Sequence, residues 1–140
     1  MKLYDIYEAG SAGYHKLFHH QNWRVAILNY IDDLALDNIR SVEAHLETDE
    51  AFVLLEGDAV LVLGQCNQGD IKGFECVRMQ PGQVYKIPKG VYHAVTMTED
   101  AKVLIIEEEN TCPDNSPTIP LDAESQQMMK ARIRASGFTF

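Results

Sequence analysis

The amino-acid sequence predicts an all-β barrel with one short helix near its C-terminus. From about residue 23 to residue 108, short apolar runs rich in β-branched and aromatic residues alternate with clusters of Gly, Pro, Asn and Asp. Only one segment, close to the C-terminus, has helical character. At 140 residues the chain has the length of one domain, so we expect a single domain over residues 1–140.

Eight apolar runs are expected to be strands, since each is short and bounded by turn residues. They span residues 23–31, 39–46, 51–57, 59–64, 74–80, 84–88, 92–97 and 102–108. Turns are expected at residues 56–58, 66–70, 80–83, 88–90 and 98–100. This spacing is typical of a closed barrel or sandwich. The residues expected in its core or pocket wall are Phe52, Leu54, Val60, Val62, Ile87, Val95 and Ile105.

The helix is predicted over residues 123–135, where Asp122 is placed to cap its first turn. Its last turns are basic, which the helix dipole favours. Residues 111–120 contain three prolines and are expected to form a linker between the last strand and this helix. The apolar residues at near-helical spacing, expected to pack on a face of the barrel, are Met128, Met129 and Ile133.

The charge balance excludes nucleic acid as a partner. Asp and Glu number 21 against 12 Lys and Arg, which gives a formal net charge of −9 and repels phosphate backbones. No run approaches the roughly 18 apolar residues of a membrane span. The N-terminus also lacks the apolar stretch of a signal peptide. We therefore expect a cytoplasmic protein that does not bind membranes.

Several potentially reactive side chains are expected to have structural roles. The cysteines Cys66, Cys76 and Cys112 form no CxxC pair and are expected to be reduced thiols, buried or half-buried. The first twenty residues show no clear pattern, and a surface loop is expected for His15, His19 and His20. A solvated acidic run is expected for Glu107, Glu108 and Glu109, although an inward-facing glutamate there would change the chemistry of a pocket.

Two segments bring metal-binding residue types into neighbouring strands. Glu43 and His45 are two residues apart in a predicted strand, so their side chains point to the same face. Glu50 stands at the start of the next strand. Further along, a turn with Pro88 delivers His93 into another strand. These segments predict that several ligands gather on one wall of the barrel.

Here the sequence resembles the cupin family, through two of its motifs. The first reads His-x-His, four residues, Glu, six residues, Gly, and matches Glu43, His45, Glu50 and Gly57, with Glu43 in place of the first histidine. The second reads Gly, five residues, Pro, one residue, Gly, two residues, His, and matches Gly82, Pro88, Gly90 and His93. The resemblance covers about residues 37–108. It implies a double-stranded β-helix, also called a jelly-roll barrel.

The resemblance also implies a divalent metal site. His45, Glu50 and His93 occupy positions that bind the metal in the family. Two neutral imidazoles and one carboxylate suit Fe, Mn, Ni, Co or Zn and leave coordination positions open for substrate. Glu43 departs from the family pattern. It is either a fourth ligand, which would favour Mn, Fe or Zn, or it serves as a general base or binds substrate while three ligands hold the metal. Two tyrosines that flank the second motif, Tyr85 and Tyr92, are further candidates to move a proton.

Two classes of function remain open at this point. The first is a metal-dependent enzyme acting on a small polar metabolite, such as a sugar derivative or a carboxylic acid, by isomerase- or lyase-like chemistry. An Fe(II) oxygenase with the same ligands is its enzymatic alternative. The second class is a non-catalytic module that binds a small molecule. We also expect a homodimer, because open jelly rolls leave edge strands that a second copy can cover.

Overall fold

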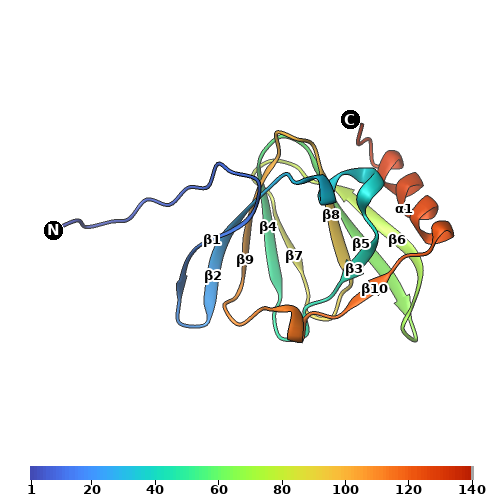
Figure 1. Cartoon of the computed structure of the whole chain (residues 1–140), viewed down its shortest axis with the longest axis horizontal. Helices are drawn as coiled ribbons and strands as arrows, with labels where there is room; N and C mark the ends of the chain where they lie inside the picture. Colours follow the sequence, from blue (N-terminus) through green and yellow to red (C-terminus); the bar gives the residue numbers. More distant parts are fainter. Residues whose placement is uncertain (140) are drawn as a thin grey trace.

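In a computed structural model that describes residues 1–139, ten strands form two five-stranded antiparallel sheets (Figure 1). The first sheet has the order β1 (Gly13–His20), β2 (Trp23–Asn29), β9 (Lys102–Glu108), β4 (Glu50–Glu56) and β7 (Val84–Ile87). The second has the order β10 (Thr118–Pro120), β3 (Ser41–Glu43), β8 (His93–Met97), β5 (Ala59–Asn67) and β6 (Asp70–Arg78). Short 3-10 turns cover Asp32–Leu34, Leu36–Asn38 and Pro113–Asn115.

Alternation along the strands builds the core between the two sheets. In β4, Phe52 and Leu54 are buried, and in β9 the buried residues are Val103 and Ile105. Successive side chains of a strand point to opposite faces, so these residues share the inner face of the first sheet. The seven residues expected in the core or pocket wall are all buried.

The eight predicted strands are present, and the differences at their ends have local causes. The predicted strand 39–46 is reduced to Ser41–Glu43, because the chain then bends away and Ala44 and Leu46 donate their N–H groups to Pro117 and Asn115. The loop expected at residues 66–70 is a two-residue turn, and β5 and β6 extend almost to its tip. Its central residues, Gln68 and Gly69, both have positive φ, which matches the twist of a hairpin.

Two expectations about the chain ends are wrong. The histidines His15, His19 and His20 lie in β1, which pairs with β2, and not in a surface loop. The segment 111–120 is not only a linker, because its last residues form β10, which pairs with β3. Both are edge strands whose residues are mostly exposed or half-buried, so neither shows the alternation of apolar and polar residues that would identify a strand.

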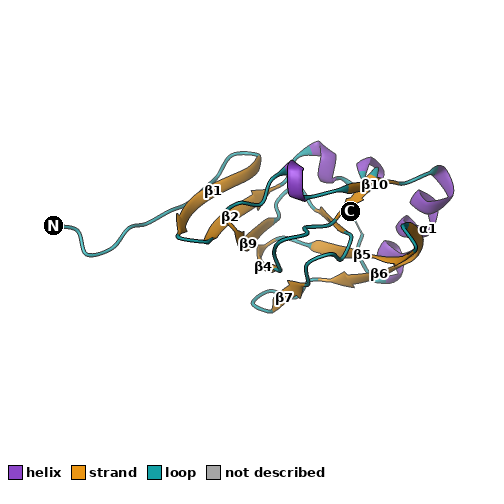
Figure 2. Cartoon of the chain, turned by 90° about the horizontal axis from the view of Figure 1, so that it is seen from below, coloured by secondary structure: helices purple, strands orange, loops and turns teal. Residues whose placement is uncertain are grey.

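The C-terminal helix α1 (Ala123–Ala135) agrees with the predicted range. The carboxylate of Asp122 accepts a hydrogen bond of 2.8 Å from the N–H of Ser125, which caps the first turn. Met129 and Ile133 are buried, and the helix packs against β6 and β5. Figure 2 places α1 at the end of the molecule opposite to the N-terminus.

The cysteines lie apart from one another and are all free. Cys76 is half-buried as expected, and its burial raises the pKa of the thiol to about 11. Cys66 and Cys112 are exposed, so the expectation of burial is wrong for these two.

Within the described chain, α1 does not have the length and apolar character that crossing a membrane requires, and neither does any other helix.

Gly57 is the motif position at which the backbone most clearly requires glycine. Its φ is +71°, and a Cβ atom there would lie 2.6 Å from Cα of Ala101. Gly69 also has a positive φ, of +84°, but a Cβ atom there would meet nothing within 4 Å. A comparison of alanine substitutions at the two positions therefore distinguishes the cost of backbone strain, which both share, from the cost of steric overlap, which arises only at Gly57.

We expect Gly57→Ala to lower the free energy of unfolding more than Gly69→Ala does. Both variants force a side chain into the left-handed region, at about 1–2 kcal/mol. Only Gly57→Ala must also displace neighbouring backbone, which adds roughly 1–3 kcal/mol. Urea unfolding of both variants measures the difference, and equal losses would show that the contact with Ala101 imposes no constraint.

Candidate metal centre

Three buried side chains from both sheets converge at one end of the barrel. Glu50 is the first residue of β4 in the first sheet, and His93 is the first residue of β8 in the second. His45 follows the end of β3. Their exposed fractions are 7% for His45, 5% for Glu50 and 6% for His93. One ligand atom from each lies within 4.8 Å of the others, so the three residues have the spacing of a metal-binding group.

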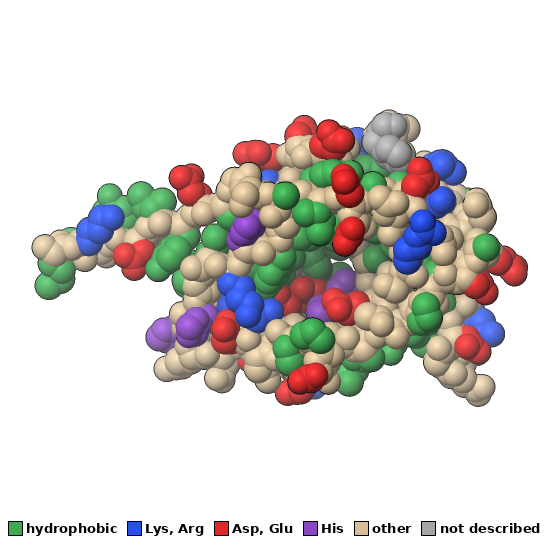
Figure 3. All heavy atoms as spheres, in the orientation of Figure 1, with side chains coloured by type: hydrophobic (Ala, Val, Ile, Leu, Met, Phe, Trp, Pro, Cys, Tyr) green, Lys and Arg blue, Asp and Glu red, His purple; other side chains and the backbone are tan. Residues whose placement is uncertain are grey.

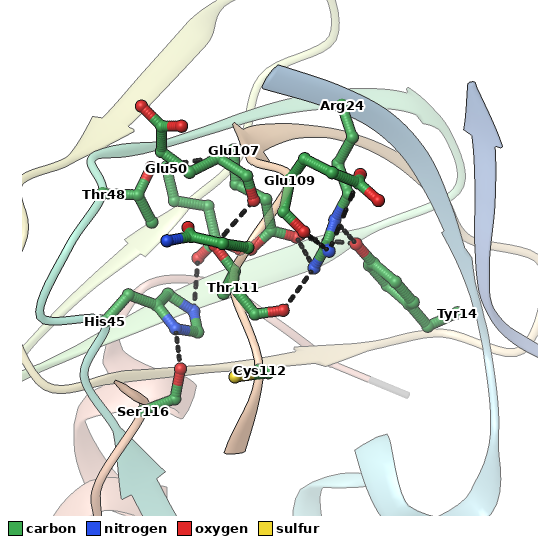
Figure 4. A network of polar contacts seen from close by, with 12 residues as sticks. Tyr14, Arg24, His45, Thr48, Glu50, Glu107, Glu109, Thr111, Cys112 and Ser116 are labelled. Carbon is green, nitrogen blue, oxygen red and sulfur yellow. Dashed lines mark hydrogen bonds and ion pairs between the residues drawn. The ribbon is translucent and has the colours of Figure 1, made fainter. Parts of the chain in front are cut away.

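Both histidines direct the same ring nitrogen toward Glu50. Nε2 of His93 is 2.9 Å from Oε1 of Glu50, and Nε2 of His45 is 3.3 Å from the same oxygen. The other nitrogens are also engaged. Nδ1 of His45 lies 2.8 Å from Oγ of Ser116 (Figure 4). Nδ1 of His93 lies 3.0 Å from the carbonyl oxygen of Val91. Second partners of this kind orient histidines that bind metals.

The cluster favours an ionised Glu50. Burial opposes its charge, but the hydrogen bonds and positive potential from His45 and His93 outweigh burial and lower the pKa of Glu50 to about 2. Burial also disfavours the charged form of His45, yet Glu50 and Glu43 raise the pKa of that histidine. Binding of a divalent cation here would require both imidazoles to be neutral, because protonated ligands do not bind a metal.

Glu43 lies beside the cluster but outside its compact group. Its Oε1 is 3.7 Å from Nε2 of His45, and its side chain is 47% exposed. It lines the cavity into which the cluster opens. This position is compatible with each of the roles expected for it, as a fourth ligand, a general base or a substrate-binding group.

The structure does not bring the two candidate tyrosines into the cavity. The hydroxyl of Tyr85 accepts a hydrogen bond from the N–H of Gln80 and donates one to Oε1 of Gln83, both 2.8 Å long. Tyr92 precedes the inward-facing His93, so its ring points to the opposite face of the second sheet and packs against the core beneath α1. Neither tyrosine lines the cavity.

The cavity has a volume of about 840 Å³. Figure 3 shows a hollow near the middle of the molecule, in the orientation of Figure 1, with acidic and histidine side chains gathered in it. Its apolar wall includes Leu28, Phe52, Val95 and Ile105, and the aromatic ring of Phe52 packs edge-on against His93. Polar and charged side chains make up the rest of the wall, so the cavity suits a small polar molecule.

A second polar network behind the cluster was not predicted from the sequence. It joins Tyr14, Arg24 and Glu107, which come from β1, β2 and β9. The hydroxyl of Tyr14 donates to Oε2 of Glu107 at 2.6 Å, Nε of Arg24 donates to the Tyr14 hydroxyl at 3.0 Å, and Nη2 of Arg24 lies 3.3 Å from Oε2 of Glu107 (Figure 4). Arg24 also donates to the carbonyl oxygens of Glu109 and Thr111, at 2.8 and 3.1 Å.

The expectation that Glu107 is solvated is wrong, since it is 5% exposed and lines the cavity. Burial raises the pKa of its carboxyl group, and the nearby Glu50 raises it further. The sequence does contain a signal for this position. Val103, Ile105 and Glu107 alternate along β9 and therefore share one face, so the inward orientation continues into the acidic run.

The chain matches no protein-family model and no curated protein. It is similar in structure to PAC13 from Streptomyces, described as a variant with uridine, at a TM-score of 0.59 and 10% identity over 90% of this chain and 98% of that one. An RmlC-like cupin from Methanocaldococcus jannaschii gives a TM-score of 0.52 and 11% identity, over 77% and 93% of the two chains. The chain therefore has the cupin double-stranded β-helix fold, which confirms the fold predicted from the two motifs.

Similar structures also include an enzyme. The QdtA 3,4-ketoisomerase from Thermoanaerobacterium thermosaccharolyticum, a double mutant in complex with TDP, gives a TM-score of 0.52 and 18% identity, over 67% of this chain and 64% of that one. The fold is thus one that supports catalysis in other proteins. Identity at this level relates the chains by fold alone.

We expect Arg24→Met to lower the free energy of unfolding by roughly 3–5 kcal/mol, because it leaves the buried carboxyl of Glu107 without its cation. The side chains of this pair are only 5% and 3% exposed. Arg24→Met/Glu107→Met should recover part of the loss, since no unpaired charge remains. Urea unfolding monitored by circular dichroism measures all three proteins.

The pair between Arg78 and Asp58 provides the control. Its atoms are closer, at 2.9 Å, but its side chains are 39% and 43% exposed. Arg78→Met should therefore cost no more than about 1 kcal/mol. A loss for Arg24→Met that is as small as this would contradict a stabilising role for the buried network.

Proposed function

We propose that this protein binds one divalent transition metal ion through His45, Glu50 and His93, and acts with it on a small polar metabolite in an isomerase- or lyase-like reaction. The observation that carries the proposal is the convergence of three buried ligand groups, within 4.8 Å of one another, at the wall of a cavity of about 840 Å³. Sugar derivatives and carboxylic acids are the substrate classes that we favour.

The donor set supports this choice of cofactor. Two imidazole nitrogens and one carboxylate oxygen suit Fe, Mn, Ni or Zn, and a three-residue set leaves positions for substrate oxygen. The histidine orientations are fixed by Ser116 and by the carbonyl of Val91, so both Nε2 atoms already face the same point. When bound, such an ion polarises a carbonyl or hydroxyl oxygen of the substrate.

The cavity side chains suggest how protons would move. Glu43 is the half-exposed carboxylate nearest the cluster, so it can reach both a ligand in the cavity and solvent. A carboxylate in that position can accept a proton from a substrate carbon or hydroxyl and return it at a neighbouring atom. Arg24 also lines the cavity, but its donors are engaged with protein atoms, so its role is to hold Glu107 and the chain near Thr111.

Removal of one ligand provides the first test. We expect protein purified without chelator, or reconstituted with Fe, Mn, Ni or Zn, to carry close to one equivalent of metal, and His93→Ala to lose it while remaining folded. His20→Ala is the matched control, because His20 is exposed in β1 and should not affect metal content. Element analysis and circular dichroism measure both properties. Full metal content in folded His93→Ala would contradict the assignment.

Ligand binding provides the second test. We expect members of a panel of sugar derivatives and carboxylic acids to raise the melting temperature of the metal-loaded protein and not of the metal-free protein. At a hundredfold excess over Kd, such binding adds about 2.7 kcal/mol to the free energy of unfolding. Glu43→Gln should keep the shift and lose turnover of the same compound. Equal shifts with and without metal would reject a metal-dependent site, and unchanged turnover in Glu43→Gln would remove Glu43 from proton transfer.

A further inference from the structure

A polar wall leads from the candidate metal centre to the edge of the second sheet. The strand registers place Glu43 of β3 opposite His93 of β8 on one side and opposite Thr118 of β10 on the other. Residues directly opposite one another on paired strands have neighbouring side chains on the same face. The three side chains therefore form one row across β8, β3 and β10, and this row begins at a candidate metal ligand.

The alternation along β3 and β10 supports the inward orientation of this row. Val42 and Ile119 belong to the apolar cluster beneath α1, so the residues next to them in each strand point to the opposite face. Those neighbours are Ser41, Glu43 and Thr118, and all three line the cavity. Within the described chain, neither of the two hydroxyl groups forms a side-chain hydrogen bond with another residue. Both are therefore available to a ligand.

The wall formed by the first sheet is apolar. It includes Leu28, Phe52 and Ile105, from β2, β4 and β9, and Phe52 lies directly opposite Ile105 in the pairing of the last two strands. Figure 3 shows apolar side chains in the hollow beside the acidic and histidine ones. A ligand that fills the cavity must therefore present polar groups to the second sheet and C–H groups to the first.

The cavity offers little positive charge to an anionic ligand. Arg24 donates to Tyr14, to Glu107 and to two backbone carbonyl oxygens, so its guanidinium group is occupied. Arg40 lies at the rim, but its Nη1 is directed toward α1 and donates to Oε1 of Gln126 at 3.2 Å. In the described part of the chain, no lysine lines the cavity.

The carboxylates of the cavity outweigh its cations. Glu107 is matched by Arg24, and the two charges of a bound divalent ion would be matched by Glu50 and Glu43. Asp33 also lines the cavity and, among the described residues, forms no ion pair with a lysine or arginine. Its charge leaves an excess of negative potential, which a carboxylate or phosphate would have to enter.

We propose that the substrate of this site is an uncharged, polyhydroxylated compound of the size of a sugar, with its hydroxyl groups on Ser41, Glu43 and Thr118 and its C–H groups on Phe52. The inference rests on the proposed function, because the candidate metal centre lies in the same cavity. Sugars combine both kinds of surface. Their hydroxyl groups donate to a carboxylate and exchange hydrogen bonds with protein hydroxyls. Of the two favoured substrate classes, charge thus selects neutral sugars over carboxylic acids.

Calorimetric titration of the zinc-loaded protein with matched compounds tests the substrate class. Each set holds a neutral pentose or hexose, the aldonic acid derived from it and its phosphate ester. We expect at least one neutral sugar to bind, and its acid and phosphate to bind about tenfold more weakly or less. An acid or phosphate that binds as tightly as its neutral parent would overturn the inference, as would a failure of every neutral sugar to bind.

Element analysis of the same samples distinguishes this inference from the proposed function. Protein that holds zinc but prefers the anionic compounds would contradict the inference alone. Protein that holds no zinc and binds no sugar would contradict both.

Substitution of Thr118 tests the polar wall, because Thr118 is not a candidate metal ligand. Thr118→Val keeps the shape of the side chain and should weaken binding of the neutral sugar about fivefold, with zinc content unchanged. Thr118→Lys adds a cation to the wall and should tighten binding of the aldonic acid about tenfold relative to the sugar. Asn67→Lys adds the same charge at the exposed end of β5, outside the cavity, and should change neither affinity.

Unchanged sugar affinity in Thr118→Val would overturn the role of the polar wall. The same holds if Thr118→Lys and Asn67→Lys have equal effects on binding of the acid. If Thr118→Lys does not fold by circular dichroism, Thr118→Val decides, because Thr118 is exposed on a short edge strand.

Discussion

The buried carboxylate of Glu50 is the constraint on which this end of the molecule depends. A carboxylate removed from water costs several kcal/mol unless charged or hydrogen-bonding partners surround it. Glu50 belongs to the first sheet, while both of its imidazole partners, His45 and His93, come from the second sheet and the segment after β3. The sheets must therefore meet in one register for the charge to be compensated, and that same register creates the candidate metal centre.

A second carboxyl close to Glu50 makes the arrangement more demanding. Glu107 is buried on the neighbouring strand β9 and raises the negative potential around the cluster. Arg24 compensates the charge of Glu107 and donates its other hydrogen bonds to backbone carbonyl oxygens. Arg24 therefore stabilises the cavity wall and is not available to bind an anion. Glu43 differs from both glutamates because it is half exposed. Burial thus separates Glu50 and Glu107, which are shielded from water, from Glu43, which is in contact with solvent.

The sequence predicted the parts of the fold in which local pattern and burial coincide. The inner strands β4, β5, β8 and β9 alternate strongly or are buried, and α1 has a capping aspartate, so all were identified. The edge strands β1 and β10 were missed because the amino-acid types along them do not alternate between apolar and polar. At the site, the two motifs identified His45, Glu50 and His93, whereas Tyr14 and Arg24 reach the cavity only through pairing of β1 with β2 and of β2 with β9. Such long-range pairing has no local signature, and the inward turn of Glu107 was hidden within three consecutive glutamates.

The central claim is that His45, Glu50 and His93 together hold a metal ion in a cupin fold that is otherwise compatible with many chemistries. Anomalous diffraction from crystals of the zinc- or cobalt-loaded protein tests it most directly. The account predicts one strong peak at about 2.0–2.2 Å from Nε2 of both histidines and from a carboxylate oxygen of Glu50. A peak confined to surface histidines, with His93 still hydrogen-bonded to Glu50, would contradict it.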